Sequence, residues 1–269
     1  MPLPHCPTKY GSRAIITARR AIEAGRQGAP PECPPDLILL YQKSLWRELN
    51  AAAVRKETGD RAPFIVLDRG DAPVAVAGGF GVGAPAAVVC LEMCVALGAR
   101  RIVVVGYAGS LQPDLHPGDV LVCDRAIRDE GTSYHYLRAE AEARADPELL
   151  DACRRALAAA EIESVSGGSW TTDAPFRETE AEVGEMQAAG VLAVEMELAA
   201  VYAAAQVRGV AAAGLCVVSD SLSELVWRPH FRDPQVQKRL RAVFGVTADM
   251  LARSSGDALP ASRHVGQTP

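Results

Sequence analysis

The fold of this chain is decided by the stretch Arg101-Ile102-Val103-Val104-Val105-Gly106-Tyr107-Ala108-Gly109-Ser110. Its first half contains four consecutive β-branched residues, Ile102 to Val105. Such an unbroken run is typical of a strand that is buried on both faces. Its second half contains two glycines and predicts a turn directly after the strand. Strands of this kind lie in sheets covered by helices on both sides, so the stretch predicts an α/β domain.

On both sides of this stretch, apolar runs of strand length alternate with alanine- and leucine-rich helical segments. The predicted strands are residues 64–68, 74–77, 101–105, 120–126, a short one near 161–166, and 210–218. The predicted helices are residues 85–97, 147–159, 195–208 and 234–251. The first, second and last begin with a proline, a residue favoured in the first helical turn. The alternation predicts a three-layer α/β fold.

A single domain accounts for this organisation, because no internal repeat occurs and no linker follows Asp60. Residues 61–252 are predicted to form the α/β domain. Residues 1–60 are predicted to be an N-terminal arm and lead-in, with an arm that covers a neighbouring subunit. Residues 253–269 are polar and are predicted to form a disordered tail.

The composition excludes several classes of function. The chain has 269 residues, 49% of them hydrophobic, which is enough for a sizeable core. Its 28 Lys and Arg and 33 Asp and Glu give a net charge of −5, with no cationic stripe for nucleic acid or an anionic membrane. We find no signal-peptide pattern and no run of the roughly 20 apolar residues that span a membrane. The seven cysteines form no Cys-x-x-Cys pair, so we expect a cytoplasmic protein with reduced thiols and no metal site.

Two glycine-rich segments follow predicted strands and are candidate ligand sites. The first, Gly-Gly-Phe-Gly-Val-Gly-Ala-Pro at residues 78–85, leads into a predicted helix. Free backbone N–H groups and the helix dipole favour an anion there, so Gly81, Val82 and Gly83 are the predicted phosphate-binding residues. The second segment, residues 106–110, contributes Tyr107, Ala108 and Gly109 as candidate substrate-binding residues. Ligands of open α/β sheets bind at the carboxyl ends of strands, and close backbone packing is the alternative for both segments.

Two acidic motifs are candidates for chemistry. Val194-Glu195-Met196-Glu197 places two carboxylates at the predicted start of a helix, where the dipole stabilises negative charge. Ordinary solvated acids of a first helical turn are the alternative. Ser219-Asp220 places an acid at the end of an apolar strand, which is typical of a catalytic acid and also of a simple cap.

The order of these motifs resembles the nucleoside phosphorylase family, which includes purine nucleoside and uridine phosphorylases and related nucleosidases. The resemblance runs from about residue 65 to residue 222. It rests on the first glycine turn and on Gly-x-Ala-Gly at 106–109, Pro-Gly-Asp-Val at 117–120, Thr-Asp-Ala-Pro-Phe-Arg-Glu at 172–178, Val-Glu-Met-Glu at 194–197 and Val-Ser-Asp at 218–220. It implies a distorted central mixed sheet, assembly as a homotrimer or homohexamer, and cleavage of the N-glycosidic bond of a nucleoside.

The resemblance also implies roles for individual residues. Glu197 would accept hydrogen bonds from the 2′- and 3′-hydroxyls of the sugar, Met196 would pack on the ribose, and Glu195 would support both. Asp220 would donate a proton or a hydrogen bond to a purine ring nitrogen, assisted by Arg228. A surface arginine beside Trp227 is the alternative for Arg228.

Three further residues are implied by the same resemblance. Phe176 lies in the motif that supplies an aromatic side chain to stack on the base, and Arg177 follows it. His5 lies near the start, as does a family histidine that is lent to the sugar 5′ position of a neighbouring subunit. A core phenylalanine, a surface arginine and an exposed histidine are the alternatives.

The chain departs from the phosphorolytic pattern at three places. No Gly-Asp-Pro-x-x-Arg loop occurs between Met1 and Asp60, Val104 replaces an arginine, and Tyr107 replaces a serine or threonine. These groups would bind an anionic co-substrate. The hydrolytic members carry an arginine at the position of Cys216, so their pattern is incomplete too.

The leading hypothesis is phosphorolysis of a purine nucleoside, which releases the free base and a pentose 1-phosphate. Asp220 favours a purine. Phosphate would be the co-substrate, and no cofactor or metal is implied. A hydrolytic nucleosidase and a nucleoside-binding protein without turnover are the alternatives.

Overall fold

Strand β5 (Arg101–Ser110) runs through the middle of the sheet in the computed structural model, which describes residues 6, 8–25, 30–53, 55–57 and 64–254. It pairs with β1 and β10, both parallel to it, and at its carboxyl end with β9, which is antiparallel. Residues Ile102 to Val105 are buried, as the sequence predicts. The predicted turn at residues 106–110 is wrong, because these residues continue β5 and pair with β10. Their glycines permit close side-chain approach instead: a Cβ atom on Gly106 would lie 3.1 Å from the ring of Tyr41.

The strands of the described chain form one mixed sheet. They are β1 (Asp36–Leu40), β2 (Arg55–Glu57), β3 (Phe64–Asp68), β4 (Pro73–Gly78), β5, β6 (Val120–Asp129), β7 (Ala143–Arg144), β8 (Val165–Thr172), β9 (Ala193–Glu195), β10 (Ala211–Ser221) and β11 (Arg228–Pro229). Their order is β11-β10-β6-β8-β9-β5-β1-β4-β3-β2, with β7 paired to β6. A second pairing of β10 with β5 closes five strands into a ring, which is the distortion of the sheet that the resemblance implies.

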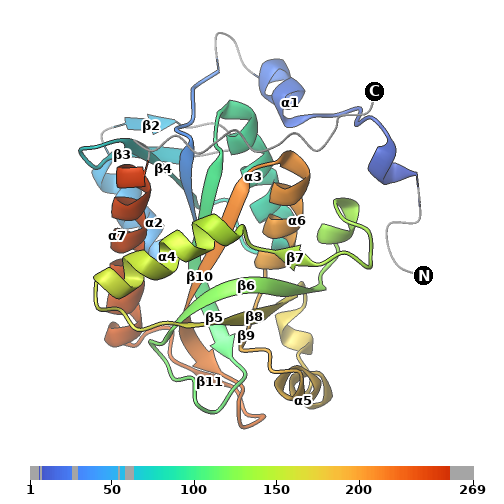
Figure 1. Ribbon diagram of the computed structural model, residues 1–269, viewed down its shortest axis with the longest axis vertical. Coiled ribbons are helices and arrows are strands. Elements are labelled where there is room, and N and C mark those ends of the chain that lie inside the picture. The colour runs from blue at the N-terminus through green and yellow to red at the C-terminus, as the bar shows by residue number, and fades with distance from the viewer. Residues whose placement is uncertain (1–5, 7, 26–29, 54, 58–63, 255–269) are drawn as a thin grey trace.

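Helices cover both faces of the sheet (Figure 1). They are α1 (Ala18–Ala24), α2 (Lys43–Ala52), α3 (Ala84–Leu97), α4 (Pro147–Ala159), α5 (Glu180–Ala188), α6 (Leu198–Arg208) and α7 (Pro234–Ser254), with short 3₁₀ turns η1 (Lys9–Gly11), η2 (Ser133–His135) and η3 (Pro175–Arg177). The core between the sheet and α3 and α6 is separate from the core beneath α2, α4 and α7. This arrangement confirms the predicted three-layer α/β fold.

The N-terminal sixty residues contain part of the sheet and are not only an arm and lead-in. Strand β1 lies between β4 and β5, and its five residues are all buried. The described part of the preceding segment contacts this same chain, because the Tyr10 hydroxyl donates a hydrogen bond to the carbonyl oxygen of Tyr134 at 2.8 Å. The predicted boundary at residue 61 is therefore too late, since β1 is a central strand of the domain.

Two predicted elements are displaced along the chain. The short strand predicted near 161–166 is β8, which begins at Val165, because α4 ends in a turn where Glu161 adopts a positive φ of 54°. The helix predicted over 195–208 begins at Leu198, because Glu195 still belongs to β9. At the carboxyl end of the domain, α7 continues to Ser254, and the remainder of the predicted tail lies outside the described residues.

The described helices and the cysteines have two further properties. Within residues 64–254 and the shorter described segments before them, no helix has the length and apolar character that crossing a bilayer requires. All seven cysteines are free, and Cys6 is the exposed one.

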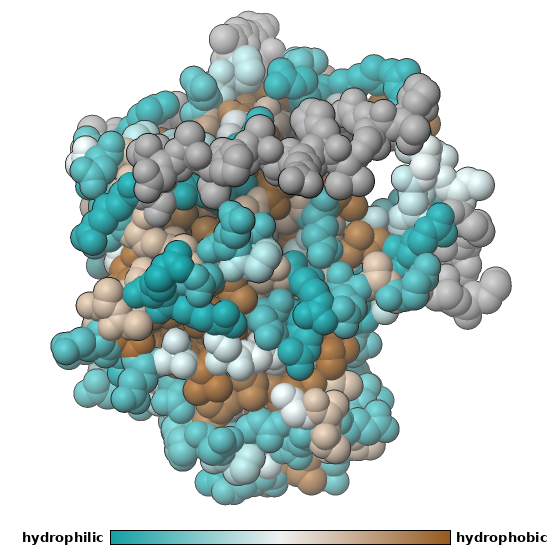
Figure 2. Space-filling model, in the orientation of Figure 1, coloured by the Kyte–Doolittle hydropathy of each residue, from teal (hydrophilic) through white to brown (hydrophobic). Residues whose placement is uncertain are grey.

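Figure 2 shows that hydrophobic residues gather on one face over the region where β5 and β8 lie in Figure 1. The candidate site lies at the carboxyl ends of β5 and β10, toward which their arrows point in Figure 1.

Candidate active site

Three strands of the ring meet at Gly109. Asp220 of β10 and Val194 of β9 both lie opposite Gly109 in the sheet register. A Cβ atom on Gly109 would lie 3.0 Å from Oδ2 of Asp220 and 3.3 Å from the side chain of Val194. Gly109 therefore leaves the space that Asp220 occupies, and the fold brings the two acidic motifs of the sequence to the same place.

Glu197 lies two residues after the end of β9 and is the N-cap residue of α6. Its side chain does not cap its own helix. Instead it turns toward the first glycine segment, where the Gly83 N–H donates a hydrogen bond to Oε1 at 2.6 Å. Only 6% of Glu197 is exposed. Burial, reinforced by the negative charge of Glu195, raises the pKa of Glu197 to about 8.

Glu195 links the start of α6 to β8 through hydrogen bonds. Its Oε2 accepts hydrogen bonds from the N–H groups of Glu197 and Leu198, each at 2.7 Å. Its Oε1 accepts from the hydroxyls of Thr171 and Ser169. Burial raises the pKa of Glu195, and these hydrogen bonds oppose that rise. Because Glu195 binds the backbone of Glu197, it fixes the position from which Glu197 reaches the site, as the sequence predicts for a supporting residue.

The first glycine segment forms the turn between β4 and α3. Gly79, Gly81 and Gly83 adopt positive φ angles, which explains why the turn needs glycine. Val82 is exposed at its tip. The predicted anion-binding donor, the Gly83 N–H, is here bound to Glu197. Aromatic side chains pack around the turn: Trp46 lies against Gly78 and Gly79, and the ring of Tyr41 meets that of Phe80 edge-on at 5.5 Å.

Asp220 is held by two donors. The Ser219 hydroxyl donates to its Oδ1 at 2.8 Å, and the Trp227 indole N–H donates to its Oδ2 at 2.9 Å. Asp220 is 9% exposed, whereas Trp227 is 59% exposed. The sequence does not indicate that Trp227 is a partner of Asp220, because the pairing of β11 with β10 that brings Trp227 back to Asp220 is not visible in the sequence.

The structure does not bring every predicted residue to Asp220 and Glu197. Arg228 is exposed and forms an ion pair with Glu224, so it does not replace Trp227 beside Asp220. Phe176 is 99% exposed and therefore packs against none of the residues that the structure describes, and Arg177 is exposed beside it. His5 lies outside the described residues.

The second glycine segment contributes unequally. Ala108 is buried beneath α3 and α6, and Gly109 contacts Asp220. The ring of Tyr107 packs on the opposite face of the sheet, 6.5 Å from the ring of Phe231. Met196 is partly buried between the two carboxylates of its motif. Thus Gly109 and Met196 lie beside the acids, whereas the Tyr107 side chain points away from Glu197.

Glu178 is a further acid near Asp220 that was not selected from the sequence. It directly follows η3 and ends the 172–178 motif, so the motif itself was the available signal. Burial raises its pKa to about 7, and the negative charges of Asp220 and Glu182 add to this. Among the residues that the structure describes, no cluster of His, Cys, Asp and Glu is arranged as a metal site.

The arrangement suits cleavage of a polar ligand with two distinct ends. Glu197 and Glu195 form a buried acidic corner whose hydrogen-bonded carboxylates can accept from sugar hydroxyls and oppose positive charge. Asp220 lies at Gly109, next to Val194 of the same acidic motif, and can exchange a hydrogen bond with a ring nitrogen.

The chain belongs to the phosphorylase superfamily, whose family model matches residues 45–248. It is 32% identical to the guanosine phosphorylase of Halorubrum lacusprofundi over 142 residues, which is 53% of this chain and 59% of that protein. It is 30% identical to the uridine phosphorylase of Thermococcus kodakarensis over 151 residues, which is 51% of this chain and 54% of that protein. The chain thus spans a little over half the length of these curated relatives.

The fold is also that of solved structures. The purine nucleoside phosphorylase of Toxoplasma gondii superposes with a TM-score of 0.75, at 22% identity, over 87% of this chain and 100% of that chain. The resemblance inferred from the motifs and the α/β architecture are both confirmed.

Proposed function

We propose that this protein cleaves the N-glycosidic bond of a purine nucleoside by phosphorolysis, which yields the free base and a pentose 1-phosphate. The observation that carries the proposal is that Gly109 brings together Asp220 and Val194, the first residue of the motif that contains Glu195 and Glu197. Membership of the phosphorylase superfamily supports the same chemistry.

In this reaction, a phosphate oxygen forms a bond to C1′ as the C1′–N9 bond breaks, and the electron pair of that bond stays with the purine. Positive charge grows on the sugar, and the nearby carboxylate of Glu197 opposes it. Two ribose hydroxyls that donate to Glu197 would favour its ionised form. The purine gains a proton at a ring nitrogen through Asp220, and hydrogen phosphate or solvent supplies that proton.

Asp220 supports a purine as the base of the substrate. Its two oxygens are oriented by Ser219 and Trp227, which leaves each oxygen able to bind a further donor or share a proton with the base. The names of the relatives include guanosine and uridine phosphorylases, so the preference for a purine rests on Asp220 and not on those names.

A hydrolytic nucleosidase is the second candidate, and the aromatic surroundings of the first glycine turn favour it. Trp46 and Tyr41 pack where an anion would otherwise approach the turn, and Val104 is a buried aliphatic residue at the place of the expected arginine. Water needs no cationic partner, whereas phosphate does.

We also propose that the protein is a cytoplasmic homotrimer or homohexamer that requires no cofactor or metal. The free thiols support a reducing compartment. The complete exposure of Phe176 supports an active site that a neighbouring subunit or the bound base completes. His5 is proposed to reach the sugar 5′ position of such a neighbour.

The test is incubation of the purified protein with adenosine, inosine, guanosine, 5′-methylthioadenosine and uridine, with and without phosphate. Chromatography of the base and sugar products distinguishes the candidates. Phosphate-dependent release of a purine and a sugar 1-phosphate is expected. Phosphate-independent release of free sugar would select hydrolysis, and binding without release of base would select the nucleoside-binding alternative.

A further inference from the structure

Tyr41 directly follows β1 and lies beside the site without belonging to any motif that the function uses. Its ring packs on the backbone of Gly106 in β5 and meets Phe80 of the first glycine turn edge-on. Tyr41 and Phe80 both pack on the core that contains Leu198 and Ala199, the first residues of α6. Tyr41 is therefore held on the same face of the sheet as Glu197.

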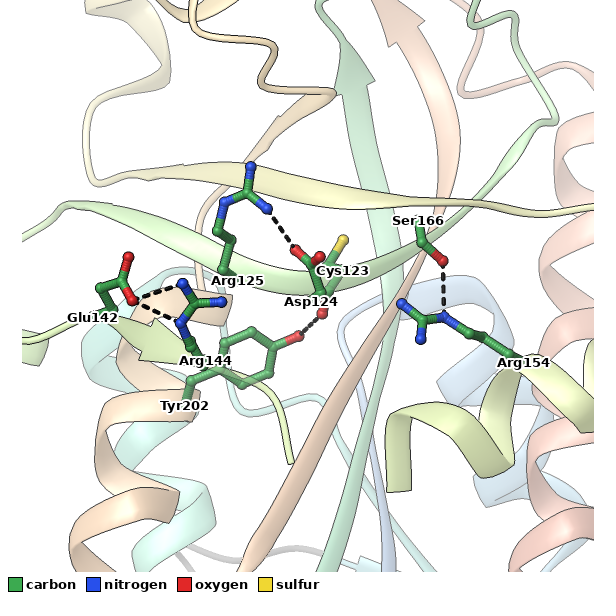
Figure 3. A network of polar contacts seen from close by, with 8 residues as sticks. All are labelled: Cys123, Asp124, Arg125, Glu142, Arg144, Arg154, Ser166 and Tyr202. Atoms are coloured by element: carbon green, nitrogen blue, oxygen red, sulfur yellow. Dashed lines mark hydrogen bonds and ion pairs between the residues drawn. The ribbon is translucent and has the colours of Figure 1, made fainter. Parts of the chain in front are cut away.

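The hydroxyl of Tyr41 is enclosed and, among the described residues, has no hydrogen-bond partner. Leaving such a group buried and unpaired destabilises the folded chain. The matched case is Tyr202 of α6, which packs in the same core. Its hydroxyl donates to the carbonyl oxygen of Cys123 at 2.6 Å (Figure 3). The unpaired hydroxyl of Tyr41 therefore destabilises the folded chain, and a phenylalanine at this position would remove that destabilisation.

Two other enclosed hydroxyls have no partner within the described residues, those of Tyr107 and Ser110. Tyr107 packs on the opposite face of the sheet, beneath α7. Ser110 lies at the end of β5 opposite Ala193, beyond the position of Asp220. Of the three, the Tyr41 hydroxyl is the one in the core that continues to Glu197.

The electrostatics agree with this placement. Burial raises the pKa of Tyr41 well above its ordinary value, and the negative charges of Glu197 and Glu195 add to the rise. Tyr41 therefore stays protonated and offers one hydrogen-bond donor. Glu197 offers acceptors when it is ionised. A ligand hydroxyl is both donor and acceptor, so it can lie between them, donating to Glu197 and accepting from Tyr41.

We propose that Tyr41 is a sugar-binding residue that donates a hydrogen bond to the ribose 2′- or 3′-hydroxyl from which Glu197 accepts. This inference rests on the proposed function. It assigns to this chain a direct selection for ribonucleosides over the matching deoxynucleoside.

The enclosure of the hydroxyl does not prevent this contact. Glu197 is itself 6% exposed, and the Gly83 N–H binds only its Oε1, which leaves acceptor sites for the sugar. The proposed function already requires the sugar to reach this buried carboxylate. The glycine turn that carries Gly83 also carries Phe80, which packs on Tyr41, so a shift of this turn that admits the sugar to Glu197 would also uncover Tyr41.

The test is Tyr41→Phe, assayed with inosine, 2′-deoxyinosine and 3′-deoxyinosine at saturating phosphate. We expect kcat/KM for inosine to fall about tenfold, the effect of losing one neutral hydrogen bond. The deoxynucleoside that lacks the contacted hydroxyl is expected to be unaffected by the substitution. The Tm is expected to stay equal or rise, because phenylalanine removes an unpaired buried group.

Tyr202→Phe is the matched control. It removes a paired hydroxyl from the same core, so its Tm is expected to fall while kcat/KM for inosine is retained. Equal losses of kcat/KM on all three nucleosides in Tyr41→Phe, no loss on any of them, or a rise in the KM of phosphate alone would overturn the inference.

Assays of the wild-type protein with inosine distinguish a failure of the proposed function from a failure of this inference. If it binds inosine without cleaving it, calorimetry replaces turnover, and Tyr41→Phe is expected to weaken inosine binding about tenfold while sparing one deoxy analogue. If the wild-type protein neither binds nor cleaves inosine, the sugar site is absent and the inference is wrong with it.

Discussion

The proposed sugar end and the proposed base end of the candidate site are built differently. At the sugar end, Glu195 and Glu197 are each 6% exposed, and their oxygens accept hydrogen bonds from backbone N–H groups and from two hydroxyls. At the base end, Asp220 is held by an indole that is itself 59% exposed, and Phe176 is 99% exposed.

The difference shows where recognition is preorganised. The sugar end lies at the junction of β9 and α6, where regular elements restrain each side chain before a ligand binds. The base end depends on the segments that follow β8 and β10, where Phe176 is 99% exposed and Trp227, although it is bonded to Asp220, is 59% exposed. We therefore expect strict recognition of the sugar and a base preference that is completed only on binding.

The largest effect is expected from the sugar end. Glu197→Gln keeps the size of the side chain and removes its charge, so kcat/KM should fall by about 10²–10³-fold, as for other groups that stabilise transition-state charge. Steady-state assays with inosine measure this. Glu48→Gln removes a surface acid that is paired with Arg241 and serves as the control, with activity retained. Equal activity of the two variants would contradict the role of Glu197.

The base end should yield a smaller loss. Asp220→Asn retains acceptors for the hydroxyl of Ser219 but cannot carry a proton to the base, so kcat should fall by about 10²-fold or more. Comparison of inosine with a nucleoside whose leaving group needs no protonation tests the reason. A similar loss with both substrates would show that Asp220 only positions the base.

The buried acid at the sugar end should also be visible in the stability. Glu197 titrates near 8 in the folded chain and near its ordinary value of 4.5 when unfolded. The folded state therefore binds more protons between these values, and the free energy of unfolding should fall as the pH rises from 4.5 to 8. One such group contributes a slope of at most about 1.4 kcal/mol per pH unit.

Urea unfolding at several pH values measures this slope. In Glu197→Gln the slope should be reduced, and Glu178, with a pKa of about 7, accounts for part of what remains. An unchanged slope in Glu197→Gln would mean that Glu197 is not the group that titrates.

The smallest effect is expected from Trp227→Phe. This change removes the donor to Oδ2 of Asp220 and keeps an aromatic ring, so kcat/KM should fall by only about three- to tenfold. Because Trp227 is largely exposed, the Tm should change little. Matched kinetic and thermal measurements check both. A loss as large as that of Asp220→Asn would show that the base end is as preorganised as the sugar end.

Much of the fold could be predicted from the sequence. The run Ile102–Val105 can be buried on both faces only in a central strand, and α4 begins and ends where its proline and apolar pattern predict. The segment Gly106–Ser110 was predicted as a turn because glycine usually interrupts strands. Here its glycines make room for Tyr41 and Asp220, which are distant in the sequence.

Only part of the candidate site could be predicted from the sequence, because the sequence shows motifs but not the contacts between distant segments. Glu197 and Asp220 could be selected because each lies in a motif that keeps its order along the chain. Trp227 and Tyr41 could not, because their partners, Asp220 and the backbone of Gly106, reach them only through strand pairing and core packing. Arg228 was a plausible partner of Asp220 by spacing alone, but its side chain pairs with Glu224.

The sequence by itself determined the α/β class, the central strand, the four longest helices and the candidate acids of the site, because apolar periodicity and short motifs are local properties of the chain. The tertiary structure decided the closure of β5 with β10, the approach of Gly83 to Glu197 and the enclosure of Tyr41. These depend on contacts between segments far apart in the chain, where burial, and not local preference, sets both the geometry and the charge of each group.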